Sequence, residues 1–354
     1  MSGKKQWIYQ IRGLAIIAVV VCHQQGILHD SEFIQLLTLY SVTTLVFLMG
    51  VTKAISLKRH YTSHAHPEGM VKYSLKAMTP VLCSYLIASF AHLSIDSGKK
   101  WVTGLSYNTV LANLLDFSAS SEFYFIRYYI LLSLYAPFLY AIIKYIIYKK
   151  ELKKYRPLLE AGVFLLVWIV GYESIGRVEV FGASYLFVYS VGLLVGQIDI
   201  PVNKKYLIPA FVLLIVGFVS VKRFYWARVD GVYDYSGGVN VLASKLQLNP
   251  PNISVILYSF GVIAVTYLLF EMCNDSKVHI IKAIGRVFGI LGKYSMDIFL
   301  WHILIQECLN RYFLGMEKNV LKWIIYYGAM FMLPAIGRSI YNRIKEKTYE
   351  VLIQ

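Results

Sequence analysis

Long apolar stretches separated by short polar or basic junctions run through almost the whole chain. A sliding window of about 19 residues finds about ten stretches long enough to cross a bilayer as α-helices. They lie near residues 7–29, 33–55, 71–95, 122–148, 157–175, 181–199, 206–222, 251–271, 284–310 and 319–341. The pattern therefore predicts an all-α fold, a polytopic transmembrane helical bundle of about ten spans.

The junctions between these stretches predict the orientation of the chain. Lys and Arg are more frequent in the N-terminal tail, the C-terminal tail and every second connection, of which 149–156 is the most basic. Cytoplasmic segments carry such an excess, so we expect both termini in the cytoplasm.

Two connections are longer than simple turns. Within 96–121, the amphipathic run Val110 to Phe117 is typical of a helix lying on the outer membrane surface. Residues 223–250 mix aromatic residues with Arg and Asp, a combination that suits sugar rings. Tyr and Trp at a bilayer interface need no ligand to explain them, so both interpretations stay open.

The composition supports a membrane protein and excludes several other classes. Of the 354 residues, 57% are hydrophobic and 16% are charged, which is too apolar for a soluble domain of this size. The net charge of +15 follows from the basic junctions and does not predict nucleic-acid binding. No P-loop, HExxH or CxxC motif occurs, so neither ATP hydrolysis nor a metal site is expected. We find no signal peptide and no attached soluble domain, and expect one integral-membrane domain over 1–354.

The first apolar stretch carries two groups that are costly inside a membrane, Arg12 and His23. On one α-helix, their spacing places them within about 20° of the same face and about 16 Å apart along the axis. Arg12 extending to the headgroups and His23 as a buried structural residue would also explain them. Both together on one stripe favour a functional site.

Two later stretches also carry polar groups. Glu122 and Arg127 are five residues apart on the fourth stretch, so they point to different faces and are not expected to pair. The ninth stretch carries Ser295, Asp297 and His302, which favours an interior cavity over a lipid-facing surface. For His302 alone, a structural hydrogen bond to another helix is the simpler explanation. Asp297 requires a cation or an imidazole nearby.

Two kinds of chemistry use these residue types. A His beside a carboxylate can act as a general base on a hydroxyl, and an Arg suits a phosphate-bearing donor, which together describe acyl transfer across the membrane. A proton-coupled transporter for a polysaccharide precursor or a small solute would use His and Asp as proton sites. No inverted repeat with broken spans supports the transporter.

Three segments carry a family resemblance: IRGLAIIAVVVCH, EFYFIRYYILLSLYAPFL and LGKYSMDIFLWHILI. They resemble, in order, an Arg and His separated by ten residues, an aromatic-rich segment with an embedded Arg, and a late segment ending in His. This combination is similar to membrane-bound acyltransferase family 3, which includes the bacterial O-antigen and capsule O-acetyltransferases. The resemblance covers nearly the whole chain.

The resemblance implies acetyl-CoA or another acyl-CoA as cytoplasmic donor and a surface carbohydrate as acceptor. It implies His23 as the essential histidine with Arg12 beside it, and Arg127 and His302 as residues lining the site. The sequence departs from the family at an R-x-x-R pair, where it has Tyr73 and Lys76. Lys keeps the charge but not the bidentate geometry of Arg. A second departure replaces a usual Ser-Gly by Met49-Gly50.

We therefore expect a membrane O-acyltransferase, in particular an O-acetyltransferase, of a bacterial inner (plasma) membrane. It would acylate a hydroxyl of a cell-surface polysaccharide, such as O-antigen or capsule, or its lipid-linked precursor. Direct transfer and transfer through an acyl-histidine stay open, as do an amino-acid or peptide acceptor and the oligomeric state, homo-oligomers included. The expected catalytic residues are His23 and Arg12; the expected donor-binding residues are Arg12, Arg127, Lys76, Lys58 and Arg59; the expected lining residues are Asp297, His302, Ser295 and Glu122.

Overall fold

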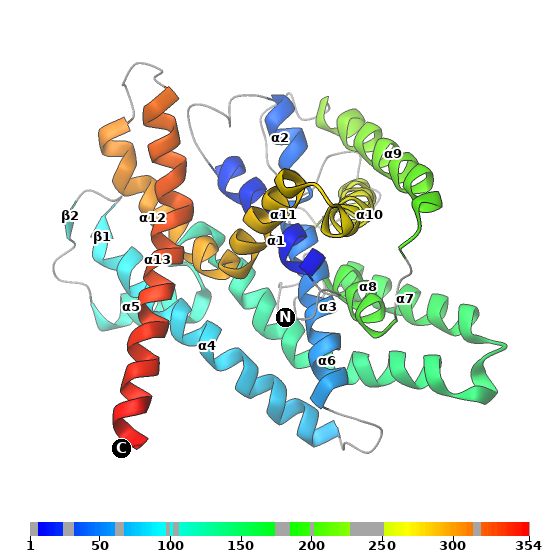
Figure 1. The fold of residues 1–354 in the computed structure, drawn as a ribbon. Coiled ribbons are helices and arrows are strands. Elements are labelled where there is room, and N and C mark those ends of the chain that lie inside the picture. The colour runs from blue at the N-terminus through cyan, green and yellow to red at the C-terminus, as the bar shows by residue number, and fades with distance from the viewer. Residues whose placement is uncertain are drawn as a thin grey trace. The chain divides into compact units, whose positions relative to one another are not determined.

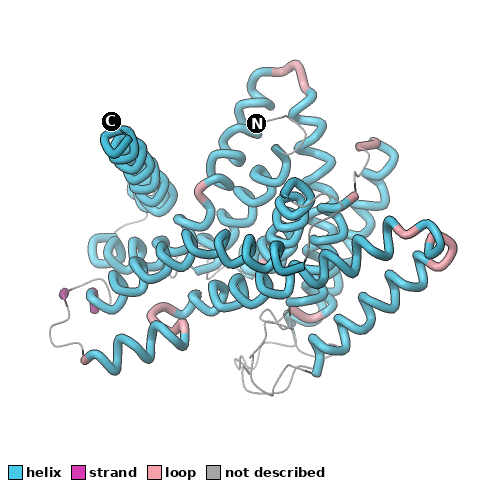
Figure 2. The backbone as a smooth tube through the Cα atoms, turned by 90° about the horizontal axis from the view of Figure 1, so that it is seen from below, coloured by secondary structure: helices cyan, strands magenta, loops and turns pink. Residues whose placement is uncertain are grey.

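The computed structural model describes residues 6–23, 32–60, 67–96, 100–101, 106–173, 185–198, 202–226, 251–313 and 320–353. Helices make up nearly all of this backbone (Figures 1 and 2). The described strands are two short ones, β1 (Ile95–Asp96) and β2 (Lys100–Trp101), which pair antiparallel. The predicted α-helical fold class is therefore confirmed.

The chain forms two compact units that alternate along the sequence. Unit 1 contains Met1–Gln35, Val81–Tyr124 and Ala283–Gln354, and unit 2 contains Leu36–Pro80 and Phe125–Lys282. The expectation of one domain over 1–354 stays a prediction.

Unit 1 is built on α1 (Gln6–His23), α12 (Ser295–Phe313) and α13 (Val320–Ile353), with α12 packed against both of the others. Half of α1 is buried, including Gln10, which is fully inaccessible. The unit also contains α5 (Tyr107–Asp116), the short turn η2 (Ser121–Phe123), most of α11 (His279–Lys293) and the second half of α4 (Pro67–Ser94). Helix α1 is thus held on several sides, which fixes the position of its polar residues.

Unit 2 is organised around α3 (Ser41–His60), which packs against α8 (Leu186–Gln197) and α10 (Ile253–Asp275). A Cβ atom on Gly50 would lie 2.3 Å from the Tyr189 carbonyl oxygen, so α3 and α8 approach through their backbones. The unit's other elements are α2 (Glu32–Thr38), which unit 1 shares, α6 (Tyr124–Tyr148), η3 (Lys150–Leu152), α7 (Arg156–Glu173), η5 (Lys204–Tyr206) and α9 (Leu207–Trp226).

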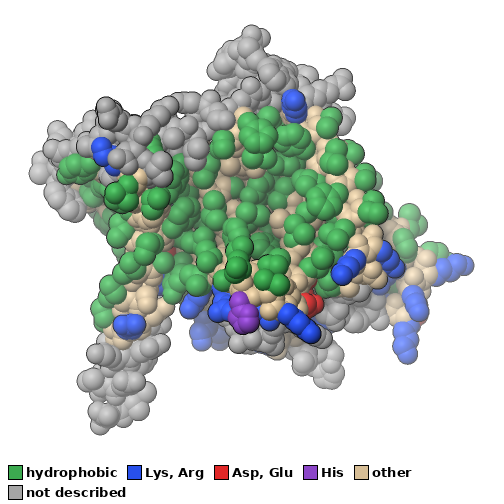
Figure 3. All heavy atoms as spheres, turned by 45° about the horizontal axis from the view of Figure 1, so that its top comes forward, with side chains coloured by type: hydrophobic (Ala, Val, Ile, Leu, Met, Phe, Trp, Pro, Cys, Tyr) green, Lys and Arg blue, Asp and Glu red, His purple; other side chains and the backbone are tan. Residues whose placement is uncertain are grey.

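Six of the described helical segments are long and apolar enough to cross a membrane, or seven if α11 and α12 count as one. In Figure 3, hydrophobic side chains cover most of the described surface on the face shown. The six segments are Gln6–His23, Phe33–Arg59, Gly69–Ser94, Tyr124–Ile146, Lys204–Lys222 and Ile253–Asp275. The chain is thus a multi-pass membrane protein, while the number of about ten spans and the side of each terminus stay predictions.

The ninth predicted span, 284–310, is not one straight helix. It consists of α11 and α12, whose axes are bent by 75°. The backbone N–H of Tyr294 closes α11 on the carbonyls of Ile290 and Leu291, while its own carbonyl accepts from the N–H of Ile298 and starts α12. Expecting a single helix was wrong, because hydropathy continues across a point where the chain changes direction.

The structure describes the first of the two long connections more fully than the second. The amphipathic run expected at Val110 to Phe117 is helical as α5, which begins earlier because Ser106 caps it by accepting from the Thr109 N–H. Phe117 ends it in the left-handed conformation, with φ of 56°. Its place at a membrane surface stays a prediction. Of the segment 223–250, α9 includes the first four residues, and 227–250 lies outside the described residues.

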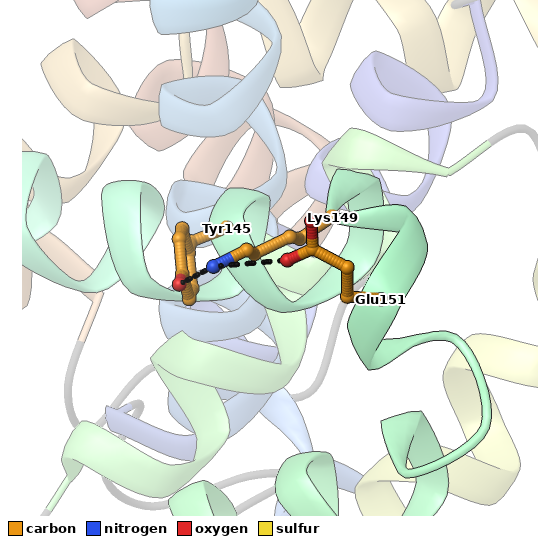
Figure 4. A network of polar contacts seen from close by, with 3 residues as sticks. All are labelled: Tyr145, Lys149 and Glu151. Atoms are coloured by element: carbon orange, nitrogen blue, oxygen red, sulfur yellow. Dashed lines mark hydrogen bonds and ion pairs between the residues drawn. The ribbon is translucent and has the colours of Figure 1, made fainter.

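The basic junction after α6 is held by a small polar network (Figure 4). The Lys149 ammonium donates to the Tyr145 hydroxyl over 2.6 Å and lies 3.3 Å from a Glu151 carboxylate oxygen. These two hydrogen bonds, that to Tyr145 first, raise the pKa of Lys149 above its ordinary value. The positive charge therefore persists at this helix C-terminus, where a cation is favourable.

Candidate functional site

Helix α1 carries both candidate catalytic residues. It is unbroken from Gln6 to His23, so Arg12 and His23 have the spacing along one face that the sequence predicts. Both side chains are half-buried. The guanidinium carbon of Arg12 lies 5.8 Å from the centre of the Tyr9 ring, one turn earlier in the helix. A fixed cation and an imidazole are thus presented by a single rigid element.

His302 of α12 contacts His23 directly. Its Nε2 atom lies 3.3 Å from the Nδ1 atom of His23, and the two ring centroids are 5.2 Å apart. His302 is fully buried. The two residues are 279 positions apart in the sequence and meet because α12 packs against the α1 helix.

The hydrogen bonds around the pair assign the protons of both rings. The Nδ1 atom of His302 lies 2.8 Å and 3.1 Å from the carbonyl oxygens of Phe299 and Ile298. A carbonyl oxygen only accepts, so this nitrogen carries the proton and, in the neutral ring, Nε2 is an acceptor. The Nδ1 atom of His23 then faces two acceptors, this Nε2 and the Val19 carbonyl at 2.9 Å. It therefore carries its own proton, which leaves a lone pair on the His23 Nε2 atom.

Gln306 of α12 binds the backbone of α1 at His23. Its side-chain amide donates to the carbonyl oxygen of His23 over 3.0 Å. Carbonyls in the last turn of a helix have no partner within the helix, so Gln306 supplies one at the end of α1. Gln306 follows His302 by four residues and lies on the same face of α12. Its Oε1 atom is buried and has no hydrogen-bond partner among the described residues.

A third histidine, His92 of α4, contacts the backbone of α12. It is buried, and its Nε2 atom lies 3.4 Å from the Leu300 carbonyl. Its ring meets the edge of Phe123 at a centroid distance of 5.1 Å. This histidine fixes α4 against α12 within unit 1.

Asp297 finds its cation on α13. Its carboxylate oxygen lies 3.2 Å from the Nε atom of Arg338, with the two side chains 13% and 29% exposed. The sequence requires a cation or imidazole for this carboxylate, and the structure supplies the guanidinium. Ser295 is buried at the start of α12. Asp297 and His302 thus make separate contacts from one helix.

Glu122, also in unit 1, is buried and accepts a hydrogen bond of 2.6 Å from the Ser120 hydroxyl. The remaining candidates belong to unit 2: Arg127 is half-buried on α6, Lys58 and Arg59 are exposed at the end of α3, and Lys76 is exposed on α4.

Tyr73, the residue at the first departure from the family pattern, has a structural contact of its own. Its hydroxyl shares a hydrogen bond with the Ser56 hydroxyl, which joins α4 to α3 within unit 2. The ammonium of nearby Lys58 donates to the Gln197 carbonyl over 3.2 Å. This end of α3 is therefore linked to both α4 and α8.

The arrangement suits proton transfer from a hydroxyl. A neutral imidazole with its proton on Nδ1 and its lone pair on Nε2 is the form that a general base requires. Among the described residues, no group of three or more His, Cys, Asp or Glu side chains could hold a metal ion. An imidazole in this form can serve as a general base or as a nucleophile.

Sequence reasoning missed three residues of this arrangement. Gln306 could have been found from its spacing of four residues after His302. Arg338 sits in a predicted span, where its charge signals an interior partner. No local pattern marks His92, whose role depends on the packing of α4 against α12.

Comparison with known proteins gives one match. A family described as an acyltransferase domain, acyltransferase family 3, matches residues 5–337. No curated protein and no solved structure matches the chain.

Proposed function

We propose that this chain, which belongs to acyltransferase family 3, is a membrane O-acetyltransferase that uses acetyl-CoA. The acceptor would be a hydroxyl of a cell-surface polysaccharide or of its lipid-linked precursor, in a bacterial inner membrane. Family membership favours transfer of an acyl group over transport of a solute. The observation that carries the catalytic part is the His302–His23 contact, since it leaves a basic nitrogen on His23.

In the proposed reaction, the Nε2 atom of His23 takes the proton of the acceptor hydroxyl while the oxygen attacks the thioester carbonyl carbon. The carbon–sulfur bond breaks, and the CoA thiolate takes the proton from the imidazolium. In the alternative route the same nitrogen attacks the thioester carbonyl carbon, the carbon–sulfur bond breaks, and CoA leaves as its thiolate. The acceptor oxygen then attacks the acyl-imidazole, which releases the imidazole, and the hydroxyl proton passes to the thiolate. Both routes require the lone pair on Nε2.

The donor-binding residues are proposals of the same kind. Arg12 is proposed to hold the phosphates or the thioester end of the donor, since it lies on the same face of α1 as His23 and carries a permanent charge. Further candidates for the phosphates of CoA are Arg127, Lys58, Arg59 and Lys76. The proposed lining residues are Ser295, Asp297, His302 and Glu122.

The proposal is tested by replacing His23 with Ala in the purified full-length protein, reconstituted in lipid nanodiscs with labelled acetyl-CoA. Wild-type protein should release CoA and transfer label to an added polysaccharide hydroxyl, and His23→Ala should do neither. The control is Lys154→Ala, at an exposed position in the turn before α7. Undiminished transfer by a folded His23→Ala protein would overturn the assignment.

A quenched-flow measurement separates the two routes. Wild-type protein mixed with labelled acetyl-CoA and no acceptor should accumulate about one protein-bound label per chain if an acyl-imidazole forms, and none if transfer is direct. Either result is compatible with His23 as the catalytic residue, acting as the nucleophile in the first case and as the base in the second, so this measurement decides only the route.

A further inference from the structure

Helix α11 has three chemically distinct faces. Successive residues of an α-helix turn by about 100°, which places all its basic residues within about 60° of one another. These residues are His279, Lys282, Arg286 and Lys293, and all are exposed. The helix contains no Asp or Glu. One stripe of α11 therefore carries charge of a single sign.

A second face of α11 is glycine-rich and packs on α1. A Cβ atom on Gly292 would lie 1.7 Å from the Tyr9 carbonyl oxygen, and one on Gly13 would lie 2.0 Å from the Phe288 carbonyl oxygen. The backbones of the two helices are thus in direct contact. This contact fixes the rotation of α11, and so it determines which of its faces point outward.

The third face is apolar and exposed. Ile280, Ile284, Val287 and Ile290 are 53–72% exposed, with Ile280 the most exposed. This face lies beside the basic stripe and away from the glycine face. A short helix with Lys and Arg on one side and aliphatic residues on the other is typical of the membrane–water interface.

The length and direction of α11 argue against a membrane crossing. Its 15 residues extend about 22 Å, less than the ~30 Å of the hydrocarbon core. It is bent by 75° from α12, so if α12 crosses the bilayer, α11 runs close to the membrane plane. A crossing would also place the basic stripe within the hydrocarbon, which is costly.

We propose that α11 is an interfacial helix that binds anionic phospholipid headgroups through Lys282, Arg286 and Lys293. Its aliphatic face enters the acyl-chain region, and its basic stripe contacts phosphate groups at the surface. Anionic lipid is the partner because the stripe is uniformly positive and adjoins an apolar surface, a combination that matches a charged headgroup attached to acyl chains. The proposal is independent of the acyl-transfer function.

The orientation of α11 is tested by measuring depth in the bilayer. Single Cys residues at positions 280, 284, 287 and 291, in a chain whose four native cysteines are replaced by Ala, would carry a nitroxide label. These positions lie on one face, so an interfacial helix gives similar depths at all four by power saturation in nanodiscs. A crossing helix gives depths that change by up to about 16 Å from 280 to 291. The second result would overturn the proposal.

The lipid preference is tested at the same surface. A bimane fluorophore at position 284 is quenched by spin-labelled phosphatidylglycerol or by spin-labelled phosphatidylcholine in otherwise identical nanodiscs. We expect about threefold stronger quenching by the anionic lipid and a ratio near one in K282Q/R286Q/K293Q. The matched control is K150Q/K153Q/K154Q, which removes the same charge from the exposed junction after α6 and should keep the threefold ratio.

Three results would contradict the lipid partner. A ratio near one in the otherwise unaltered chain would show no preference for the anionic headgroup. An equal loss of preference in both triple variants would assign it to overall charge. Loss of the preference when CoA is added in excess would assign the stripe to a soluble phosphate ligand.

Discussion

The proton on the Nδ1 atom of His23 decides whether this residue can act as a base. An isolated imidazole exchanges between two tautomers, and only one of them has its lone pair on Nε2. In this protein the Nε2 atom of His302 and the Val19 carbonyl together favour that tautomer, since both accept from the His23 Nδ1 atom. In the proposed mechanism His302 is therefore a positioning residue, acting on the substrate through His23.

Replacing His302 with Phe tests this role. Phe retains the ring volume but removes one of the two acceptors of the His23 Nδ1 proton and leaves the Val19 carbonyl in place. The rate of transfer should therefore fall about tenfold, the cost of losing one orienting hydrogen bond. The KM for acetyl-CoA should not change. The ¹⁵N chemical shifts of His23 report the tautomer and should change from the Nδ1–H form to a mixture. A reduced rate with an unchanged His23 tautomer would contradict the positioning role.

For single residues, the sequence predicts which side chains belong to the candidate site but not which of them contact one another. His23 and His302 were each predicted as site residues, and the structure brings them together. Their direct contact could not be predicted, because two side chains on helices far apart in sequence meet only through tertiary packing. The carboxylate of Asp297, expected beside a cation or an imidazole, pairs with the guanidinium of Arg338.

At the scale of elements, the packing of α1 on α11 requires residues without a Cβ atom at the contact positions Gly13 and Gly292. We predict that Gly292→Ala destabilises the protein by about 1–3 kcal/mol, because its methyl group would overlap the Tyr9 carbonyl and force the helices apart. Gly328→Ala on α13 is the matched control, since a Cβ atom there meets nothing within 4 Å. It should stabilise the protein by about 0.5–1 kcal/mol through helix propensity.

Thermal unfolding in detergent, followed by circular dichroism, gives both changes. Equal midpoints for Gly292→Ala and the wild type would show that the α1–α11 contact can relax around a methyl group.

The ion pair between α12 and α13 makes a second prediction about elements. Asp297→Asn and Arg338→Gln should each lower the stability, and the double variant should lose less than the sum. For side chains that are 13% and 29% exposed, we expect a coupling energy of about 1 kcal/mol. A double-mutant cycle from unfolding midpoints measures it, and simple additivity would show that the pair contributes no stability.

The sequence predicted helices reliably where an apolar stretch coincides with one continuous helix, as in α1, α6 and α10. The expectation of a single helix at 284–310 was wrong, because hydropathy measures how apolar a segment is and not the direction of its helix axis. The start of α5 was also misplaced, because the capping hydroxyl of Ser106 precedes the apolar run.

For the whole molecule, the basic residues make a prediction about topology. The junction 149–156 should face the cytoplasm and 96–121 the opposite side. In a cysteine-free chain in intact cells, a membrane-impermeant maleimide should label Ser118→Cys and leave Lys153→Cys unlabelled until the cells are opened. Labelling of both, or of Lys153→Cys alone, would contradict the predicted orientation. Two further positions in the N- and C-terminal tails would then locate the chain ends.

The backbone contact at Gly13 and Gly292 has a consequence for how α1 can respond to a bound molecule. A shift of register by one residue, about 1.5 Å along the axis with about 100° of rotation, would put the Cβ atom of Arg12 or Leu14 where Gly13 now meets the Phe288 carbonyl, so the two helices are locked in register. A molecule bound near Arg12 must be accommodated by rotation of side chains, because helix α1, which carries both Arg12 and His23, cannot shift along its axis. The backbone positions of Arg12 and His23 therefore keep one separation along α1 while their side chains adjust.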